Sequence, residues 1–385
     1  MTWDATIQTV HKLADEFRQS APQRDRDRSL PFNEITELST AGFFALTIPR
    51  EYGGLQAPPS VVAEATRILA TADPNIAQIP QSHFVYVNFL KIAGSHQQKQ
   101  YFFSKILDGQ RLANAQSERN GSTIASITTT LDAVETGYRL NGTKYYCTGT
   151  VFADWIPVLS TSEGTEFVAF VPSDSPGLTI DDDWNGFGQR TTASGTVHLD
   201  NVHVDSAWVV PREPAVRAPA AYGAFAQLLH AAIDAGIARN ALDDAAEFIR
   251  TSARPWFEAK VDEARDDPLT TYRLGEVTVD VASAEALVAE AGALVDEAFA
   301  AFSSEQATRA SLAVAIAKAA ADRAALSATN ALHELGGTRT ADASLNLHRH
   351  WRNARTHTLH DPVRWKYHNI GRALLGHPQP QHALF

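Results

Sequence analysis

Residues 138–150 read YRLNGTKYYCTGT and differ in texture from the chain on either side of them. Aromatic and β-prone residues are concentrated there around an Asn-Gly pair, which is typical of β-strands broken by turn residues. Two later runs have the same texture, FVAFVP at 167–172 and GTVHLDNVHV at 195–204. In the last run Asp200 and Asn201 interrupt the alternation of apolar residues, which indicates a bulge or a turn. We therefore expect a compact β domain in the middle of the chain.

Apolar residues at helical spacing lie on both sides of this β region. Ile35, Leu38 and Phe43 precede it, and long apolar stripes within alanine-rich segments follow it. Three or four long helices joined by polar loops would form a bundle. The fold class is therefore α+β, with a helical N-terminal domain at 1–112, the β domain at 113–212 and a C-terminal helical bundle at 213–385.

The composition narrows the class of protein. The chain has 385 residues, 33 basic against 44 acidic side chains and a net charge of -11, which disfavours a nucleic-acid or anionic-membrane surface. The single Cys147 cannot form an intrachain disulfide, and neither a secretory signal nor a membrane span is recognised. We expect a cytoplasmic protein with no nucleic-acid or membrane partner.

Six motifs in a fixed order carry a family resemblance. They are GFFALTIPREYGG (42–54), NAQSERNGS (114–122), LNGTKYYCTG (140–149), GQRTTASGTVHLDNVHV (188–204), LHELGGTRT (332–340) and WRNAR (351–355). Together they resemble the acyl-CoA dehydrogenase superfamily over nearly the whole chain. The resemblance implies a helical N-terminal domain, a central β-barrel or sandwich, a C-terminal four-helix bundle, a bound flavin and a homotetramer.

The residues after WRNAR depart from the dehydrogenase pattern. The dehydrogenases have a Tyr-Glu-Gly-Thr turn there, whose glutamate removes a proton from the substrate, whereas this chain has His360, Asp361 and Pro362. A carboxylate that is one methylene shorter, on a backbone restricted by proline, has less reach toward a substrate carbon. Asp361 is therefore expected to form a turn rather than to act as the base.

This departure, together with SHF at 82–84 and RPW at 254–256, is similar to the flavin-dependent monooxygenase branch of the superfamily. Within that branch the likeness is to sulfur-acquisition oxidoreductases and dibenzothiophene monooxygenases. The resemblance implies a cofactor of reduced FMN, with FAD as the alternative, supplied by a separate flavin reductase. It also implies that the chain uses O2 to oxygenate a small, possibly organosulfur, substrate.

His83 and His360 fall where that branch carries its two active-site histidines. An imidazole can donate or accept a proton near neutral pH, so such a pair suits an oxygen transfer in which a leaving oxygen must be protonated. We expect His360 to stabilise the oxygenated flavin and His83 to position or protonate it.

Seven further residues are expected to bind the flavin. Hydroxyl, amide and backbone groups can bond the edge of the ring, and an arginine can clamp a phosphate in two-pronged fashion. Glycines allow close backbone approach, although a helix C-cap explains one of the two equally well. The seven candidates are Asn114, Ser117, Tyr146, Thr148, Arg254, Gly336 and Gly337.

Three other functions are alternatives to the monooxygenase. A metal site could use some of the five histidines between 348 and 368, but their spacing completes no ligand set, and we expect no metal. An FAD-dependent acyl-CoA dehydrogenase with Asp361 as its base is the first alternative that stays open. The second is a non-catalytic bundle protein that acts as a partner or regulator and holds no flavin.

Overall fold

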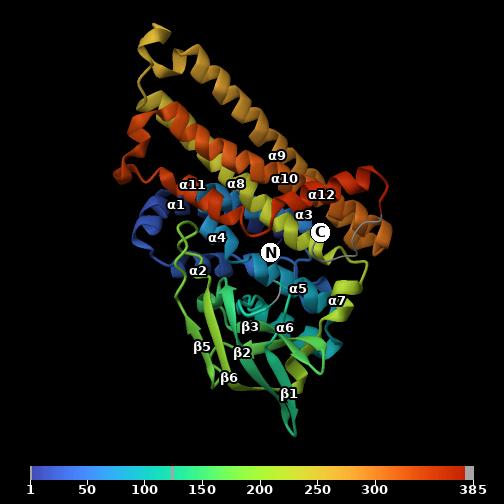
Figure 1. Cartoon of the computed structure of the whole chain (residues 1–385). Coiled ribbons are helices and arrows are strands. Elements are labelled where there is room, and N and C mark those ends of the chain that lie inside the picture. The colour runs from blue at the N-terminus through green and yellow to red at the C-terminus, as the bar shows by residue number, and fades with distance from the viewer. Residues whose placement is uncertain (1, 122, 124, 378–385) are drawn as a thin grey trace.

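The computed structural model of the protein describes residues 2–121, 123 and 125–377. Helices form one broad layer, and a β-sheet lies against one side of it (Figure 1). The helices before the sheet are α1 (Trp3–Asp27), α2 (Phe32–Thr40), α3 (Pro59–Ala72), α4 (Pro74–Gln78), α5 (Gln81–Ala93) and α6 (His96–Leu107). The helices after it are α7 (Glu213–Arg217), α8 (Tyr222–Thr251), α9 (Pro268–Ala301), α10 (Ser304–Gly336), α11 (His348–His357) and α12 (Val363–Leu374).

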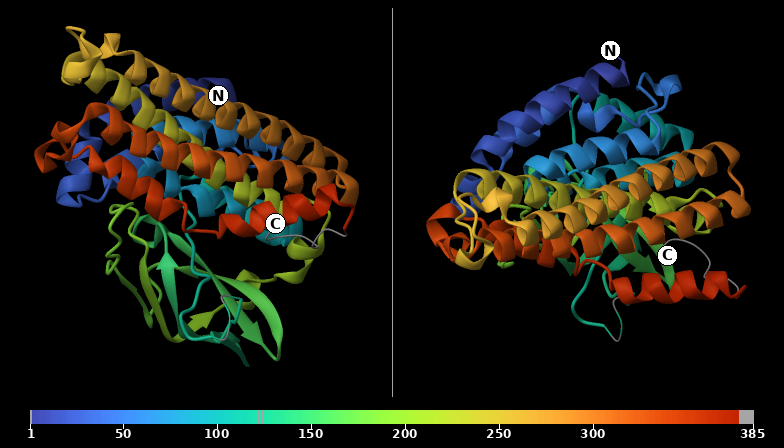
Figure 2. Two further views of the ribbon diagram at one scale, coloured as in Figure 1. Left: turned by 45° about the horizontal axis from the view of Figure 1, so that its top comes forward. Right: turned by 90° about the horizontal axis from the view of Figure 1, so that it is seen from above.

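The expected β domain is present as a seven-stranded sheet in the order β5-β6-β2-β1-β3-β4-β7. Its strands are β1 (Thr130–Val134), β2 (Gly137–Cys147), β3 (Trp155–Ser162), β4 (Thr165–Pro172), β5 (Leu178–Asp181), β6 (Gly195–Val204) and β7 (Val209–Pro211). All paired strands are antiparallel except β1 and β3. The helices lie on one side of the sheet, and its other side faces away from them, as the left view of Figure 2 shows.

The Asn-Gly pair at 141–142, which sequence indicated as a turn, lies inside strand β2. Leu140 pairs with Val202 and Gly142 pairs with Leu199, so the expected bulge at Asp200 and Asn201 is present opposite Asn141. The Asn-Gly pair itself does not turn, because β2 runs through it without a break. Gly142 is required there, since a Cβ atom would lie 2.4 Å from the Oγ1 of Thr129.

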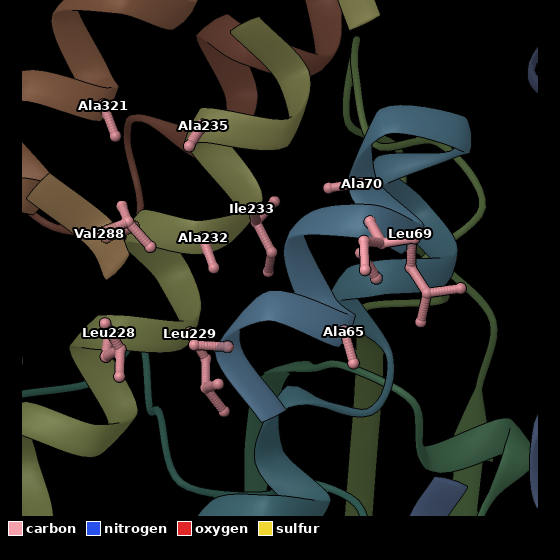
Figure 3. Packing of buried hydrophobic residues seen from close by; sticks show 14 of the residues in the cluster. Ala65, Leu69, Ala70, Leu228, Leu229, Ala232, Ile233, Ala235, Val288 and Ala321 are labelled. Atoms are coloured by element: carbon pink, nitrogen blue, oxygen red, sulfur yellow. The ribbon is translucent and has the colours of Figure 1, made fainter. Parts of the chain in front are cut away.

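The long helices α8, α9 and α10 pack side by side, and α3 covers α8 from the other side. Figure 3 shows the seam between α8 and α3, where Leu229 and Ile233 of α8 point toward α3 and Ala70 of α3 points toward α8. The two helices approach closely at Gly236, where a Cβ atom would come within 2.4 Å of the Cβ of Ala70. Small residues at this seam therefore let the bundle and the N-terminal helices share one apolar core.

The short helix α4 links the N-terminal helices to the sheet. Asp73 caps it by accepting a hydrogen bond from the Asn75 amide at 3.0 Å, and the guanidinium of Arg24 donates to Asp73 at 3.1 Å. Asn75 in turn accepts a hydrogen bond from the Thr191 amide at 3.2 Å. The start of α4 is thereby fixed against the loop that precedes β6. No helix within the described residues is long and apolar enough to cross a membrane.

Candidate active site

Three histidines meet where α8, α11 and the turn after α11 come together. The Nδ1 atom of His230 lies 3.2 Å from the Nε2 atom of His357, and the rings of His230 and His360 lie with their centroids 3.9 Å apart. His230 and His357 are buried, whereas the side chain of His360 is 47% exposed. The cluster therefore joins the protein interior to the surface of the helical layer.

A carboxylate stands at each end of this cluster. At the buried end, Asp234 is 2.5 Å from the Nδ1 of His357 and forms an ion pair with the buried Lys318 of α10. At the outer end, Asp361 lies 3.2 Å from the Nδ1 of His360 and accepts a hydrogen bond from Gln227 at 2.7 Å. Each carboxylate thus has both a basic partner and a second donor.

Burial and neighbouring charge set the protonation of these groups. Burial, followed by the charges of neighbouring histidines, holds the pKa of His230 well below its usual value. Burial likewise lowers the pKa of His357. Although burial alone would raise the pKa of Asp361, its hydrogen bond to His360 and the histidine charges lower it. Near neutral pH the site therefore holds an ionised Asp361 and neutral imidazoles at 230 and 357.

Residues of the N-terminal helices and of the loops of the sheet also lie beside the histidine cluster. The side-chain oxygen of Gln78, at the end of α4, lies 3.0 Å from the Nε2 of His357. The next residue, Ile79, has its carbonyl oxygen so close to Gly149 that a Cβ atom there would be 3.2 Å away. Asn353 of α11 accepts a hydrogen bond from the Gln189 amide at 2.7 Å. The histidine cluster therefore lies at the junction of all three parts of the chain (Figure 1).

For His83 sequence predicted a role in positioning or in protonation, and its hydrogen bonds favour positioning. Its Nε2 is 2.8 Å from the carbonyl oxygen of Phe44, and its Nδ1 accepts a hydrogen bond from the Leu112 amide at 3.0 Å. Burial lowers the pKa of His83 to about 4. Because both ring nitrogens bond the backbone, this neutral side chain has no nitrogen left for the proton transfer predicted for it.

Asn114 and Ser117 lie on the segment that His83 holds. The Oδ1 atom of Asn114 is buried and has no hydrogen-bond partner among the described residues, which marks it as an acceptor for an absent donor. Ser117 is exposed, and its carbonyl oxygen accepts a hydrogen bond from the Tyr145 amide at 2.9 Å. Ser122, the last residue of that motif, lies outside the described residues.

Tyr146 and Thr148 lie at the end of β2 and point to different surroundings. Tyr146 is 49% exposed, with a positive φ of 58°, and the guanidinium carbon of Arg119 lies 5.1 Å from its ring centroid. Thr148 is buried, and its hydroxyl is 2.7 Å from that of Ser194. The backbone of Tyr146 thus turns its ring outward, while Thr148 belongs to a buried hydroxyl pair.

Three of the predicted flavin ligands are remote from this junction within one chain. Arg254 is exposed just beyond α8, and the 21 helical steps from His230 to Thr251 span about 32 Å. Gly337 has a φ of 68° and caps α10 through its amide, and a Cβ atom on Gly336 would lie 2.3 Å from Thr340. These two glycines therefore serve the end of α10, and the tip that bears Arg254 points away from the sheet (Figure 1).

Sequence reasoning missed most of the cluster. His357 was considered only as a metal ligand, and His230, Asp234, Lys318 and Gln78 were not singled out. A signal was available, because His230 and Asp234 interrupt an apolar stripe four residues apart and Lys318 interrupts the apolar run at 310–321. What the sequence could not supply was the pairing of α8 with α10 and α11.

Three consecutive family models match the chain. Residues 4–110 match the acyl-CoA dehydrogenase N-terminal domain, residues 113–202 the middle domain and residues 228–365 the C-terminal domain. This chain belongs to the acyl-CoA dehydrogenase family. The predicted fold class and family are thereby confirmed, whereas the domain boundaries at 112 and 212 stay a prediction.

Relatives in the monooxygenase branch match almost end to end. Dibenzothiophene monooxygenase from Rhodococcus qingshengii is 32% identical, with 97% of this chain and 94% of the relative aligned. The probable FMNH2-dependent monooxygenase SfnC from Pseudomonas putida is 29% identical, with 98% and 96% aligned. The crystal structure of TdsC from Paenibacillus sp. A11-2 with FMN and indole has a TM-score of 0.92 and 30% identity, covering 98% of this chain and 99% of TdsC. The predicted place among flavin-dependent monooxygenases is confirmed.

Proposed function

We propose that this chain is the oxygenase component of a two-component monooxygenase that receives reduced FMN from a separate reductase and uses O2 to oxygenate a small organosulfur compound. Its relatives support this: one is a dibenzothiophene monooxygenase, one is described as FMNH2-dependent, and TdsC was crystallised with FMN. FMN is preferred over FAD on the same ground. The compartment that we propose is the cytoplasm.

The observation that carries the proposal is the state of Asp361. A dehydrogenase base must be free to take a proton from carbon, and its basicity rises with its pKa. Asp361 instead accepts hydrogen bonds from Gln227 and pairs with His360, which lower its pKa. A weakly basic, fully engaged carboxylate suits the orientation of His360 better than proton abstraction.

Several residues at the junction have the chemistry that a flavin ring requires. The unpartnered Oδ1 of Asn114 can accept a hydrogen bond from a ring N–H, and the hydroxyl of Thr148 and the backbone near Ser117 and Tyr146 can bond its polar edge. Reduced FMN, when bound, supplies the two electrons that activate O2. Of the three clustered histidines His360 has the exposed ring, so it would be the one to hold or donate a proton beside the bound flavin.

His83 acts in this scheme through another segment. Its two backbone hydrogen bonds fasten Leu112 to Phe44, and Leu112 precedes Asn114 by two residues. His83 is therefore a positioning residue that sets the place of the Asn114 side chain. Of the two roles that sequence predicted for His83, positioning or protonation, we propose the first.

We further propose that the protein is a homotetramer. Large apolar side chains are exposed around the α8–α9 tip, among them Trp256 (62%), Phe257 (74%), Leu269 (77%) and Tyr272 (68%). Such a patch on a net acidic protein favours contact with another subunit. In an oligomer, Arg254, Gly336 and Gly337 would serve the flavin of a neighbouring copy, which one chain alone does not permit.

An isotope experiment tests the function. The protein is incubated under 18O2 with FMN, an NADH-dependent FMN reductase and dibenzothiophene, and the product is analysed by mass spectrometry. We expect one 18O atom in a sulfur-oxygenated product, and no product when the reductase is omitted. Reduction of FAD bound to the protein by an acyl-CoA under nitrogen, without 18O incorporation, would instead establish the dehydrogenase. Absence of flavin binding in both redox states would establish a non-catalytic protein.

A further inference from the structure

The carboxylate of Asp234 determines where His357 carries its hydrogen. Asp234 is ionised because it pairs with the buried ammonium group of Lys318, and an ionised carboxylate can only accept hydrogen bonds. The Nδ1 atom of His357 lies 2.5 Å from Asp234, so this nitrogen must be the donor. A neutral His357 ring then has a lone pair on its Nε2 atom.

His230 extends this arrangement by one ring. Its Nδ1 atom lies 3.2 Å from the Nε2 of His357, so His230 donates from Nδ1. The atom of Gln78 that lies 3.0 Å from the same Nε2 is its amide oxygen, and a half-turn of the amide exchanges this oxygen for the NH2 group, which then donates to Nε2. The neutral His230 ring is therefore left with a lone pair on Nε2, and the hydrogen bond found for this ring among the described residues is made at Nδ1.

We propose that Asp234, His357 and His230 form a hydrogen-bonded relay whose outer end, the Nε2 of His230, is a temporary proton acceptor of the active site. The inference rests on the proposed function. The ring of His360 lies against His230 with a centroid separation of 3.9 Å, so the acceptor is adjacent to the histidine assigned to the flavin. The negative charge of Asp234, transmitted through His357, stabilises the proton while His230 holds it.

The reaction requires a group that takes up a proton lost by the flavin and later gives it to the departing oxygen. A sulfide, O2 and reduced FMN yield a sulfoxide, oxidised FMN and water, and both hydrogens of the water are those that the flavin loses. His230 accepts one of these protons at Nε2 and returns it to the departing oxygen. The relay therefore ends in its starting state, with no net proton consumed.

The surroundings of His230 contain charges of both signs. The groups that face it are Asp234 on α8, His357 on α11, His360 and Asp361 in the following turn, Lys318 on α10 and the neutral Gln78 on α4. Burial opposes protonation of His230, as would positive charge on His360 or His357 and as does the ammonium group of Lys318, whereas Asp361 favours it. Because these effects oppose one another, His230 binds the proton only weakly and releases it readily.

Nuclear magnetic resonance of the flavin-free protein tests the relay itself. Histidine labelled with 15N reports which ring nitrogen carries hydrogen, independently of any activity. At pH 8 we expect hydrogen on Nδ1 of both His230 and His357, and the Asp234→Asn variant is expected to change the tautomer of His357. Hydrogen on the Nε2 of His230 in the unaltered protein would overturn the proposal.

Two matched variants then test the proton transfer. His230→Asn keeps a donor at the position of Nδ1 but has no atom at Nε2, whereas His350→Gln alters a buried Asp–His pair outside the relay, in which His350 Nε2 lies 2.7 Å from Asp244. We expect His230→Asn to lower the rate of product formation about 100-fold and to flatten its pH profile. His350→Gln is expected to stay within about twofold of the unaltered protein.

These experiments distinguish a failure of the proposed relay from a failure of the proposed function. The predicted tautomers in a protein that incorporates no 18O would retain the relay and reject the monooxygenase. Full 18O incorporation by His230→Asn, with an unchanged pH profile, would reject the proton acceptor and retain the monooxygenase. If Asp234→Asn fails to fold, the tautomers of the unaltered protein and the His230→Asn rates still decide the matter.

Discussion

His360 and Asp361 are neighbours in sequence, but their side chains differ in solvent exposure. The side chain of His360 is 47% exposed and that of Asp361 is 25% exposed, with an ion-pair distance of 3.2 Å between them. Because Asp361 orients one ring nitrogen, the other is directed elsewhere with a defined tautomer. This turn gives the site an oriented imidazole where the dehydrogenases have a free carboxylate.

Removal of that imidazole should uncouple the reaction rather than abolish flavin binding. We expect His360→Ala to bind reduced FMN within about threefold of the unaltered protein but to divert most of the consumed oxygen to hydrogen peroxide, because one proton-transfer group contributes about 10²–10⁴ in rate. Peroxide and product are measured together at equal flavin turnover. His368→Ala, which alters an exposed histidine on α12, is the control. Unchanged coupling in His360→Ala would remove His360 from this role.

Helix packing, rather than local sequence, builds the buried half of the site. The contact between Lys318 of α10 and Asp234 of α8 joins residues 84 positions apart, and both side chains are almost inaccessible. An isolated buried charge is far more costly than a paired one. The pair therefore couples the register of two helices to the position of His357.

Lys318→Met keeps a side chain of similar shape that is one atom shorter, and it removes the charge. It leaves the carboxylate of Asp234 with only His357 as a partner, so we expect the free energy of unfolding to fall by about 3–5 kcal/mol. Urea titration measures this change, with Lys12→Met on the exposed face of α1 as the control. A loss below about 1 kcal/mol would show that the pair does not hold the helices.

His83 should make the stability of the N-terminal helices depend on pH. Its pKa is about 4 in the folded protein, below the ordinary value of 6.5, so the unfolded chain binds a proton more readily. The contribution is complete above pH 6.5 and is lost as the pH falls toward 4, by roughly 3 kcal/mol in all. His83→Gln should reduce the slope of unfolding free energy against pH in that window. An identical slope in both proteins would contradict the buried neutral state.

The elements were more predictable than the site. Apolar spacing indicated the long helices, and the interruption at Asp200 and Asn201 indicated the bulge in β6, because both patterns are local. The residues around His230 were not predictable in the same way, since they come from helices that are distant in sequence. For His83 the sequence left positioning and protonation open, because the backbone atoms of Phe44 and Leu112 that bond its ring have no side-chain signature.

At the scale of the whole molecule, the position of Arg254 connects flavin binding to assembly. It lies at the α8–α9 tip, beyond some 32 Å of helix from His230, and therefore cannot reach a flavin at the junction of its own chain. We expect Arg254→Ala to weaken FMN binding at least tenfold in the assembled protein, because a guanidinium–phosphate contact is lost. Arg250→Ala, at the end of the same helix, is the control. Light scattering establishes the oligomeric state of each sample. If Arg254→Ala forms a tetramer with unchanged affinity for FMN, Arg254 does not bind the flavin phosphate.

The measurement that tests the central claim most directly is a stopped-flow absorbance trace after the protein and chemically reduced FMN are mixed with oxygenated buffer. For a monooxygenase we expect oxidised FMN to appear more slowly than it does from free reduced FMN, after a distinct transient absorbance. An oxidation trace that matches free FMN, at protein concentrations that bind the reduced flavin, would contradict the account.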